Sequence, residues 1–87
     1  MSDLQIAEGV VTAQDGGEAF LLDTITRRYY RLNPAGVTVW LAIQNDADPL
    51  SALAARYPTV DRAELARDVA AICAGLTEAG LLRAATR

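Results

Sequence analysis

Apolar and polar positions alternate in the first third of the chain, a pattern typical of strands with one buried face. Residues 9–13 (GVVTA), 18–23 (EAFLLD) and 28–32 (RYYRL) are rich in aliphatic, β-branched or aromatic side chains. The sequence QDGG at residues 14–17 tolerates the positive φ angles that a tight hairpin turn requires. We therefore expect three strands with short connections, which favours an antiparallel meander.

From residue 34 onwards the apolar positions recur every three or four residues, which is the period of a helix face. Asn33 and Pro34 are typical of a helix start, because the Asn side chain caps free N–H groups and proline fits the first helical position. The pattern predicts helices over residues 34–44, 49–57 and 62–79. The third helix carries its apolar stripe at Leu65, Val69, Ile72, Cys73 and Leu76.

This order of elements predicts the α+β class: a winged helix-turn-helix in which a three-stranded antiparallel sheet is followed by three helices. We expect residues 1–87 to form a single domain with a core over about residues 9–82. No element is expected before residue 9. Leu81 and Leu82 should fold back onto the core, while residues 83–87 should fray.

The amino-acid composition narrows the classes of function that the chain can have. The net charge is −3, and all eight basic residues are arginine because lysine is absent. Histidine is absent too, which excludes an imidazole base or ligand. The acidic balance disfavours nucleic-acid binding, which needs concentrated positive charge. The N-terminus does not resemble a signal peptide, and no segment is long enough to span a membrane, so we expect a cytoplasmic location.

The reactive side chains have structural explanations. Cys73 is the only cysteine and lies on the inner stripe of a helix, so we interpret it as an inert buried thiol in a reducing compartment. Asp48 and Asp61 fall where helix caps belong, and Glu64 lies in the first turn of a helix. We therefore expect capping or solubility to explain the carboxylates in this part of the chain: Asp46, Asp48, Asp61, Glu64 and Asp68. We predict no catalytic residue, no metal site and no cofactor.

The third predicted strand, residues 28–32, raises a question of its own. Neighbouring side chains point to opposite faces, so Tyr30 and Leu32 should meet the helices while Tyr29 and Arg31 face away. In a simple meander this strand lies at an edge, with one row of unpaired N–H and C=O groups. In one interpretation Tyr30 is an ordinary core residue and the edge needs protection. In the other, the edge is a surface that receives a peptide strand. Periodicity alone leaves both interpretations open.

The segment LLDTITRRYYRLNPAGVTVW, followed by a short helix ending at RYP and then by RDVAAICAGLTEAGLL, resembles the PqqD-like family. The resemblance covers roughly residues 10–82 and is closest to the stand-alone form found in bacterial lasso-peptide clusters. Its most specific parts are residues 30–34 (YRLNP), Gly36, Trp40, Asp68, Val69 and residues 80–82 (GLL).

The resemblance implies a non-catalytic domain that binds the leader segment of a ribosomally made precursor peptide, as a strand added beside the third strand. A separate, cysteine-protease-like leader peptidase is the implied second partner. The implied peptide-binding residues are Arg28, Tyr29, Tyr30, Arg31, Leu32, Arg67, Asp68, Ala71 and Ile72.

Two other hypotheses stay open. A small winged-helix DNA-binding regulator would use the third helix for recognition, although that helix is net negative. A structural subunit would dock on a larger enzyme through the third strand without touching substrate. An open strand edge could also pair with a second copy to form a homodimer. No nucleic acid or membrane partner is predicted.

Overall fold

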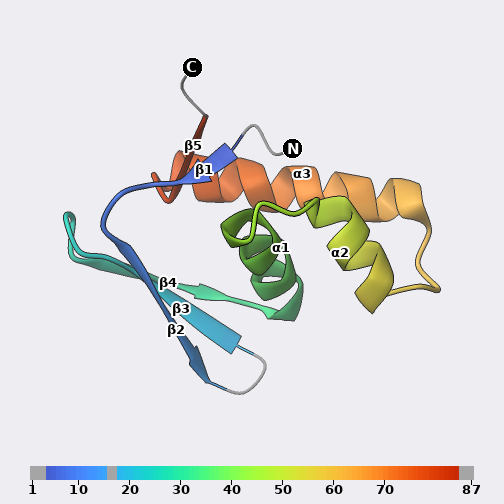
Figure 1. Cartoon of the computed structure of the whole chain (residues 1–87), viewed down its shortest axis with the longest axis horizontal. Coiled ribbons are helices and arrows are strands. Elements are labelled where there is room, and N and C mark those ends of the chain that lie inside the picture. The colour runs from blue at the N-terminus through green and yellow to red at the C-terminus, as the bar shows by residue number, and fades with distance from the viewer. Residues whose placement is uncertain (1–3, 16–17, 85–87) are drawn as a thin grey trace.

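The computed structural model describes residues 4–15 and 18–84. Three strands, β2 (Val10–Asp15), β3 (Glu18–Asp23) and β4 (Arg28–Leu32), form an antiparallel sheet in the order β2-β3-β4. Figure 1 shows this sheet on one side of the molecule and the helices on the other. The predicted meander is confirmed, and β4 lies at its edge.

The helices follow the sheet as α1 (Pro34–Gln44), α2 (Pro49–Arg56) and α3 (Arg62–Glu78). The predicted α+β class is therefore confirmed, with helix ends within one residue of the sequence-based bounds. The Asn33 side chain accepts a hydrogen bond from the Gly36 N–H at 2.8 Å, so the turn from β4 into α1 is capped as predicted.

The other two predicted caps differ from each other. Asp48 accepts hydrogen bonds from the N–H groups of Leu50 and Ser51, both at 3.3 Å, and from the Ser51 hydroxyl at 2.6 Å. The Ser51 hydroxyl lowers the pKa of Asp48 below its usual value. Asp61 occupies the N-cap position of α3, but its side chain makes no capping hydrogen bond. The predicted N-cap position of Asp61 is therefore confirmed, but the capping hydrogen bond expected there is not formed.

The chain ends also differ from the prediction. Two short strands, β1 (Leu4–Ile6) and β5 (Leu82–Ala84), pair antiparallel in a separate ribbon. The sequence predicted no element before residue 9 and fraying from residue 83; residues 85–87 lie outside the described part. Strands of three residues are too short to show a periodicity, and their pairing joins opposite ends of the chain. The prediction that Leu81 and Leu82 fold back is confirmed, because both are buried.

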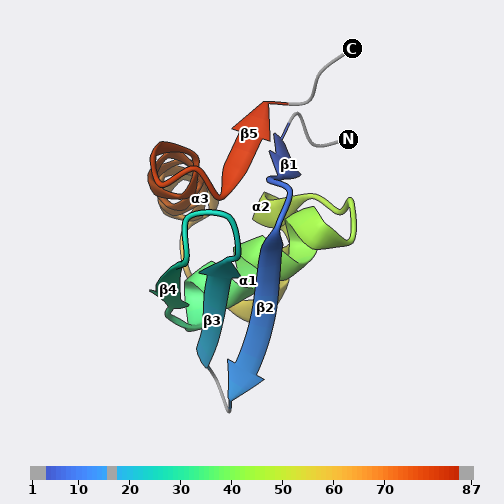
Figure 2. The same ribbon diagram turned by 90° about the vertical axis from the view of Figure 1, so that its left-hand side faces the viewer.

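The core lies between the inner face of the sheet and the three helices. Trp40, Leu21, Leu53 and Leu81 are among its fully buried side chains. The Trp40 indole Nε1–H donates a hydrogen bond to the Thr12 hydroxyl at 3.1 Å, which ties α1 to β2. This packing fixes the sheet against α1. Figure 2 shows the three strands in front of α1, with β4 on the side nearest α3.

Candidate functional site

The free edge of β4 is the first part of the site. Along one edge β4 pairs with β3, in a register that joins Leu21 to Tyr30 and Ala19 to Leu32. No described strand pairs with its other side, because β1 and β5 form their own ribbon. The described C-terminal segment therefore does not cover this edge, and a row of backbone N–H and C=O groups remains available for a further strand.

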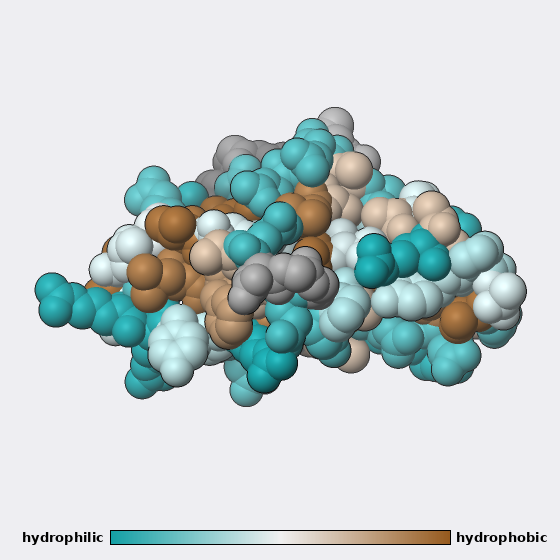
Figure 3. All heavy atoms as spheres, turned by 90° about the horizontal axis from the view of Figure 1, so that it is seen from below, coloured by the Kyte–Doolittle hydropathy of each residue, from teal (hydrophilic) through white to brown (hydrophobic). Residues whose placement is uncertain are grey.

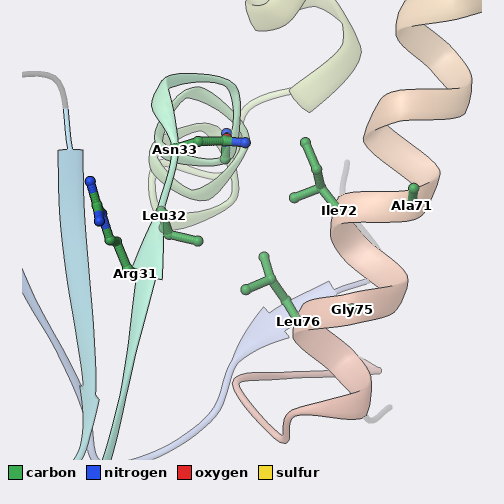
Figure 4. A pocket seen from close by; sticks show the side chains of 8 residues that line it. Arg31, Leu32, Asn33, Ala71, Ile72, Gly75 and Leu76 are labelled. Carbon is green, nitrogen blue, oxygen red and sulfur yellow. The ribbon is translucent and has the colours of Figure 1, made fainter.

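A hollow of about 230 Å³ lies between this edge and α3, and we call it the β4–α3 groove. Its walls come from the end of β4, the start of α1 and the C-terminal half of α3. Figure 4 shows Leu32, Ile72 and Leu76 pointing toward one another across it. The residues that line it are Arg31, Leu32, Asn33, Gly36, Ala71, Ile72, Gly75 and Leu76.

The two neighbouring tyrosines face opposite sides, as predicted. The Tyr30 hydroxyl donates a hydrogen bond to the Ala79 carbonyl oxygen at 3.5 Å, so Tyr30 reaches toward the end of α3. Leu32, on the same face, is buried at the helix corner. Tyr29 points away from the helices and is 73% exposed. The inner face of β4 thus supports the core and the groove, while its outer face is open.

The arginines of β4 are both exposed. Arg31 donates a hydrogen bond from its Nε to Glu18 and forms a salt bridge with that carboxylate across the sheet. An ion pair this exposed contributes little to stability. Arg28 opens the strand after the turn that joins β3 to β4. Both arginines thus belong to the strand that carries the free edge.

The predicted residues of α3 separate into two places. Ala71 and Ile72 line the β4–α3 groove, together with Arg31 and Leu32 of the predicted strand set. Asp68 instead lines a second hollow of about 220 Å³, bounded by residues of α1, α2 and α3 such as Leu53 and by Tyr57, which follows α2. Arg67 is exposed and lines neither hollow.

Sequence reasoning missed four groove residues: Asn33, Gly36, Gly75 and Leu76. A helix repeat provides the signal for two of them, because Gly75 and Leu76 follow Ala71 and Ile72 by four residues and lie on the same face. Asn33 was interpreted only as a cap. Its position next to Leu32 at the corner between β4 and α1 also places it at the groove.

Among the described residues, no group of three or more Cys, Asp or Glu side chains is placed to hold a metal ion. Partial burial raises the pKa of the Cys73 thiol, so the reactive thiolate is disfavoured at neutral pH. None of the described helices combines the length and the apolar character that crossing a membrane requires. What the groove offers is a surface for binding.

A second surface lies on the outer face of the sheet. Val11 pairs with Leu22, and Leu22 pairs with Tyr29, so the three form one row across β2, β3 and β4. Ile25, in the turn after β3, is 73% exposed. These four are the large apolar side chains that the described part of the chain exposes, and we call them the outer apolar patch. Figure 3 shows apolar side chains gathered over the sheet.

The turn that carries Ile25 is held in place. The Asp23 carboxylate is buried and accepts hydrogen bonds from the N–H groups of Ile25 at 2.9 Å and Thr26 at 3.2 Å. The Thr24 N–H and hydroxyl both donate to the Gly9 carbonyl oxygen, at 2.9 and 2.7 Å. These hydrogen bonds fix the turn and hold the exposed Ile25 side chain in a defined position.

Comparison with known proteins gives a family and a fold. The family model described as "Coenzyme PQQ synthesis protein D (PqqD)" matches residues 18–82. A comparison with curated proteins found no match.

Two solved structures share the fold. One is described as "TbiB1 in Complex with the TbiA(beta) Leader Peptide"; it is 27% identical, with a TM-score of 0.85, over 95% of this chain and 99% of that chain. The other is described as "Lasso peptide synthetase B1 complexed with the leader peptide"; it is 21% identical, with a TM-score of 0.82, over 94% of this chain and 99% of that chain.

Proposed function

The chain belongs to the PqqD family, and we propose from this premise that it is a non-catalytic adaptor that binds the leader segment of a ribosomally made precursor peptide. The observation that carries the proposal is the free edge of β4 beside an apolar groove on α3. The leader peptide in the 27% identical TbiB1 structure supports this class of ligand. The product class, a lasso peptide, rests on the sequence resemblance described above.

The proposed binding mode is strand addition. The leader lies along β4 and extends the sheet, so that main-chain hydrogen bonds set its direction. Alternate side chains of an added strand point to the two faces of the sheet. Those on the inner face enter the β4–α3 groove, where Leu32, Ile72 and Leu76 offer apolar contacts. One or two buried anchors there supply most of the binding free energy.

The proposed second partner is a leader peptidase that acts on the bound precursor. The outer apolar patch supports this part of the proposal, because it faces away from the groove and stays accessible when β4 receives a peptide. Tyr29 belongs to both surfaces: its backbone lies on the receiving strand and its side chain lies in the patch. A protein docked on the patch would therefore lie beside the bound leader.

The alternative of a DNA-binding regulator has less support. Within the described residues, α3 carries Glu64 and Asp68 on the side that borders the second hollow. Arg62 and Arg67 are the only basic residues of that helix. Such a surface does not concentrate the positive charge that phosphate binding requires.

A pair of substitutions at Arg31 tests strand addition. Arg31→Ala removes the ion pair with Glu18, whereas Arg31→Pro also removes a backbone N–H from β4. One lost main-chain hydrogen bond costs about 1 kcal/mol, so we expect Arg31→Pro to weaken leader binding by roughly fivefold or more relative to Arg31→Ala. The measurement is a fluorescence-anisotropy titration of the labelled leader peptide of the cognate precursor.

Folding must be checked in both variants. Proline is tolerated on an edge strand only where the replaced N–H faces away from the neighbouring strand. Circular dichroism and thermal unfolding therefore show whether Arg31→Pro keeps the sheet. If both variants are folded and bind the leader equally well, the strand-addition mode is refuted. If the wild-type chain does not bind the leader at all, the adaptor function itself is refuted.

A further inference from the structure

Gly75 differs from the other glycines of the described chain in that the protein's own fold does not explain it. Gly9 and Gly80 have φ angles of +82° and +80°, which disfavour any side chain. A Cβ at Gly36 would lie 3.2 Å from the Asn33 Oδ1 and 3.3 Å from the Leu32 Cδ2, so a side chain there would crowd the helix cap. A Cβ at Gly75 would have no neighbour within 4 Å.

Glycine is also unfavourable at this place for the helix itself. Gly75 lies inside α3, which runs from Arg62 to Glu78, and glycine is a poor residue for a helix interior compared with alanine. Alanine would fit the free protein without a clash and would stabilise the helix. The benefit of glycine must therefore come from something outside the free chain.

The location of Gly75 indicates that the benefit of glycine lies in the binding of a ligand. It lines the β4–α3 groove together with Ile72 and Leu76. Figure 4 shows Gly75 beside Leu76 and one turn from Ala71, without a side chain to narrow the groove. At this point the bare backbone of α3 forms part of the groove wall, so a ligand can approach the helix more closely than any other residue would permit.

We propose that Gly75 is a specificity-determining residue, at which a bulky apolar side chain of the bound leader packs directly against the backbone of α3. This inference rests on the proposed leader-binding function and adds to it a size requirement. The free space at Gly75 is filled by the ligand, so a methyl group there overpacks the complex without affecting the free protein. Stability and binding therefore respond to the same substitution in opposite directions.

The test is Gly75→Ala, with Ala70→Gly as its matched control. Ala70 lies in the same helix, is exposed and does not line the groove. We expect Gly75→Ala to raise the Tm by about 4 to 8 °C and to weaken leader binding by about tenfold. Ala70→Gly should lower the Tm and leave binding unchanged. The double variant should return to a near-wild-type Tm while binding stays weak.

A series of leader peptides separates groove shape from helix stability. The probe is the fluorescein-labelled leader peptide of the cognate precursor, with each large apolar residue replaced by alanine in turn. One replacement should remove the difference between wild type and Gly75→Ala, because the side chain that meets the added methyl group is then gone. The same binding loss with every peptide would overturn the proposal.

The other outcomes are also decisive. Unchanged affinity of Gly75→Ala for the intact leader would overturn the proposal while leaving leader binding itself intact. A loss of affinity in Ala70→Gly equal to that in Gly75→Ala would show that helix stability controls binding, and would overturn it as well. Failure of the wild-type chain to bind would refute the adaptor function and this inference together, and wild-type titration distinguishes that case.

Discussion

The outer apolar patch gives a prediction whose size can be worked from the structure. The perturbation is the double variant Val11→Ser/Leu22→Ser. Val11 is 54% exposed and Leu22 is 43% exposed, so a docked partner can still cover about half of each side chain. Full burial of such a side chain contributes about 2 kcal/mol. Covering both exposed halves therefore contributes about 2 kcal/mol in total, which corresponds to roughly 30-fold in affinity.

The assay is cleavage of the precursor by the leader peptidase of the same pathway, with increasing amounts of this chain. We expect the double variant to need about 30-fold more protein for half-maximal cleavage. Leader binding, measured separately by anisotropy, should stay unchanged, because both side chains lie on β2 and β3 and face away from the groove. Ala55→Ser on α2 is the control, since Ala55 is exposed, lies outside the outer apolar patch and does not line the groove.

Two results would refute this reasoning. If the peptidase cleaves the precursor equally well with the double variant and with the wild-type chain, the patch takes no part in presenting the leader. A parallel loss of leader binding would show that the substitutions damage the sheet, and a shift in the thermal unfolding curve would identify that cause. Sedimentation of the wild-type chain as a dimer, reduced to a monomer by the same substitutions, would assign the patch to a second copy instead.

Two further predictions concern the core and the thiol. Trp40→Ala removes a fully buried side chain and its hydrogen bond to Thr12. It should lower the free energy of unfolding by about 3 to 5 kcal/mol, which is close to the total stability of many domains. Chemical denaturation measures this loss, and a value below about 1 kcal/mol would contradict the described packing. Burial raises the pKa of Cys73, so the pH profile of its alkylation rate with iodoacetamide should have a higher midpoint than that of a free cysteine peptide. A midpoint at or below the peptide's value would be incompatible with the described burial.

The sequence predicts the elements that have strong local signals. Asn33 and Pro34 mark the corner between β4 and α1, and the alternation in residues 28–32 places Tyr30 and Leu32 on the inner face. These features depend on neighbouring residues, so periodicity and capping preferences suffice to find them.

The rest depends on contacts between distant parts of the chain. The ribbon of β1 and β5 joins residues near both ends, and each strand is too short to show a pattern. The inner stripe of α3 was visible in the sequence, but the division between Ile72 in the groove and Asp68 in the second hollow depends on where β4 and α2 lie. Gly75 gives no hydrophobic signal at all, and its significance appears only from the empty space around it.

The central claim is that a peptide strand adds to the free edge of β4, and amide hydrogen exchange followed by NMR tests it most directly. With the leader bound, exchange should slow at alternate residues of β4, from Arg28 to Leu32, because their N–H groups gain partners in an added strand. The other edge of the sheet, β2, should exchange as in the free protein. Protection that appears along β2, or a bound leader that leaves β4 unprotected, would contradict the account.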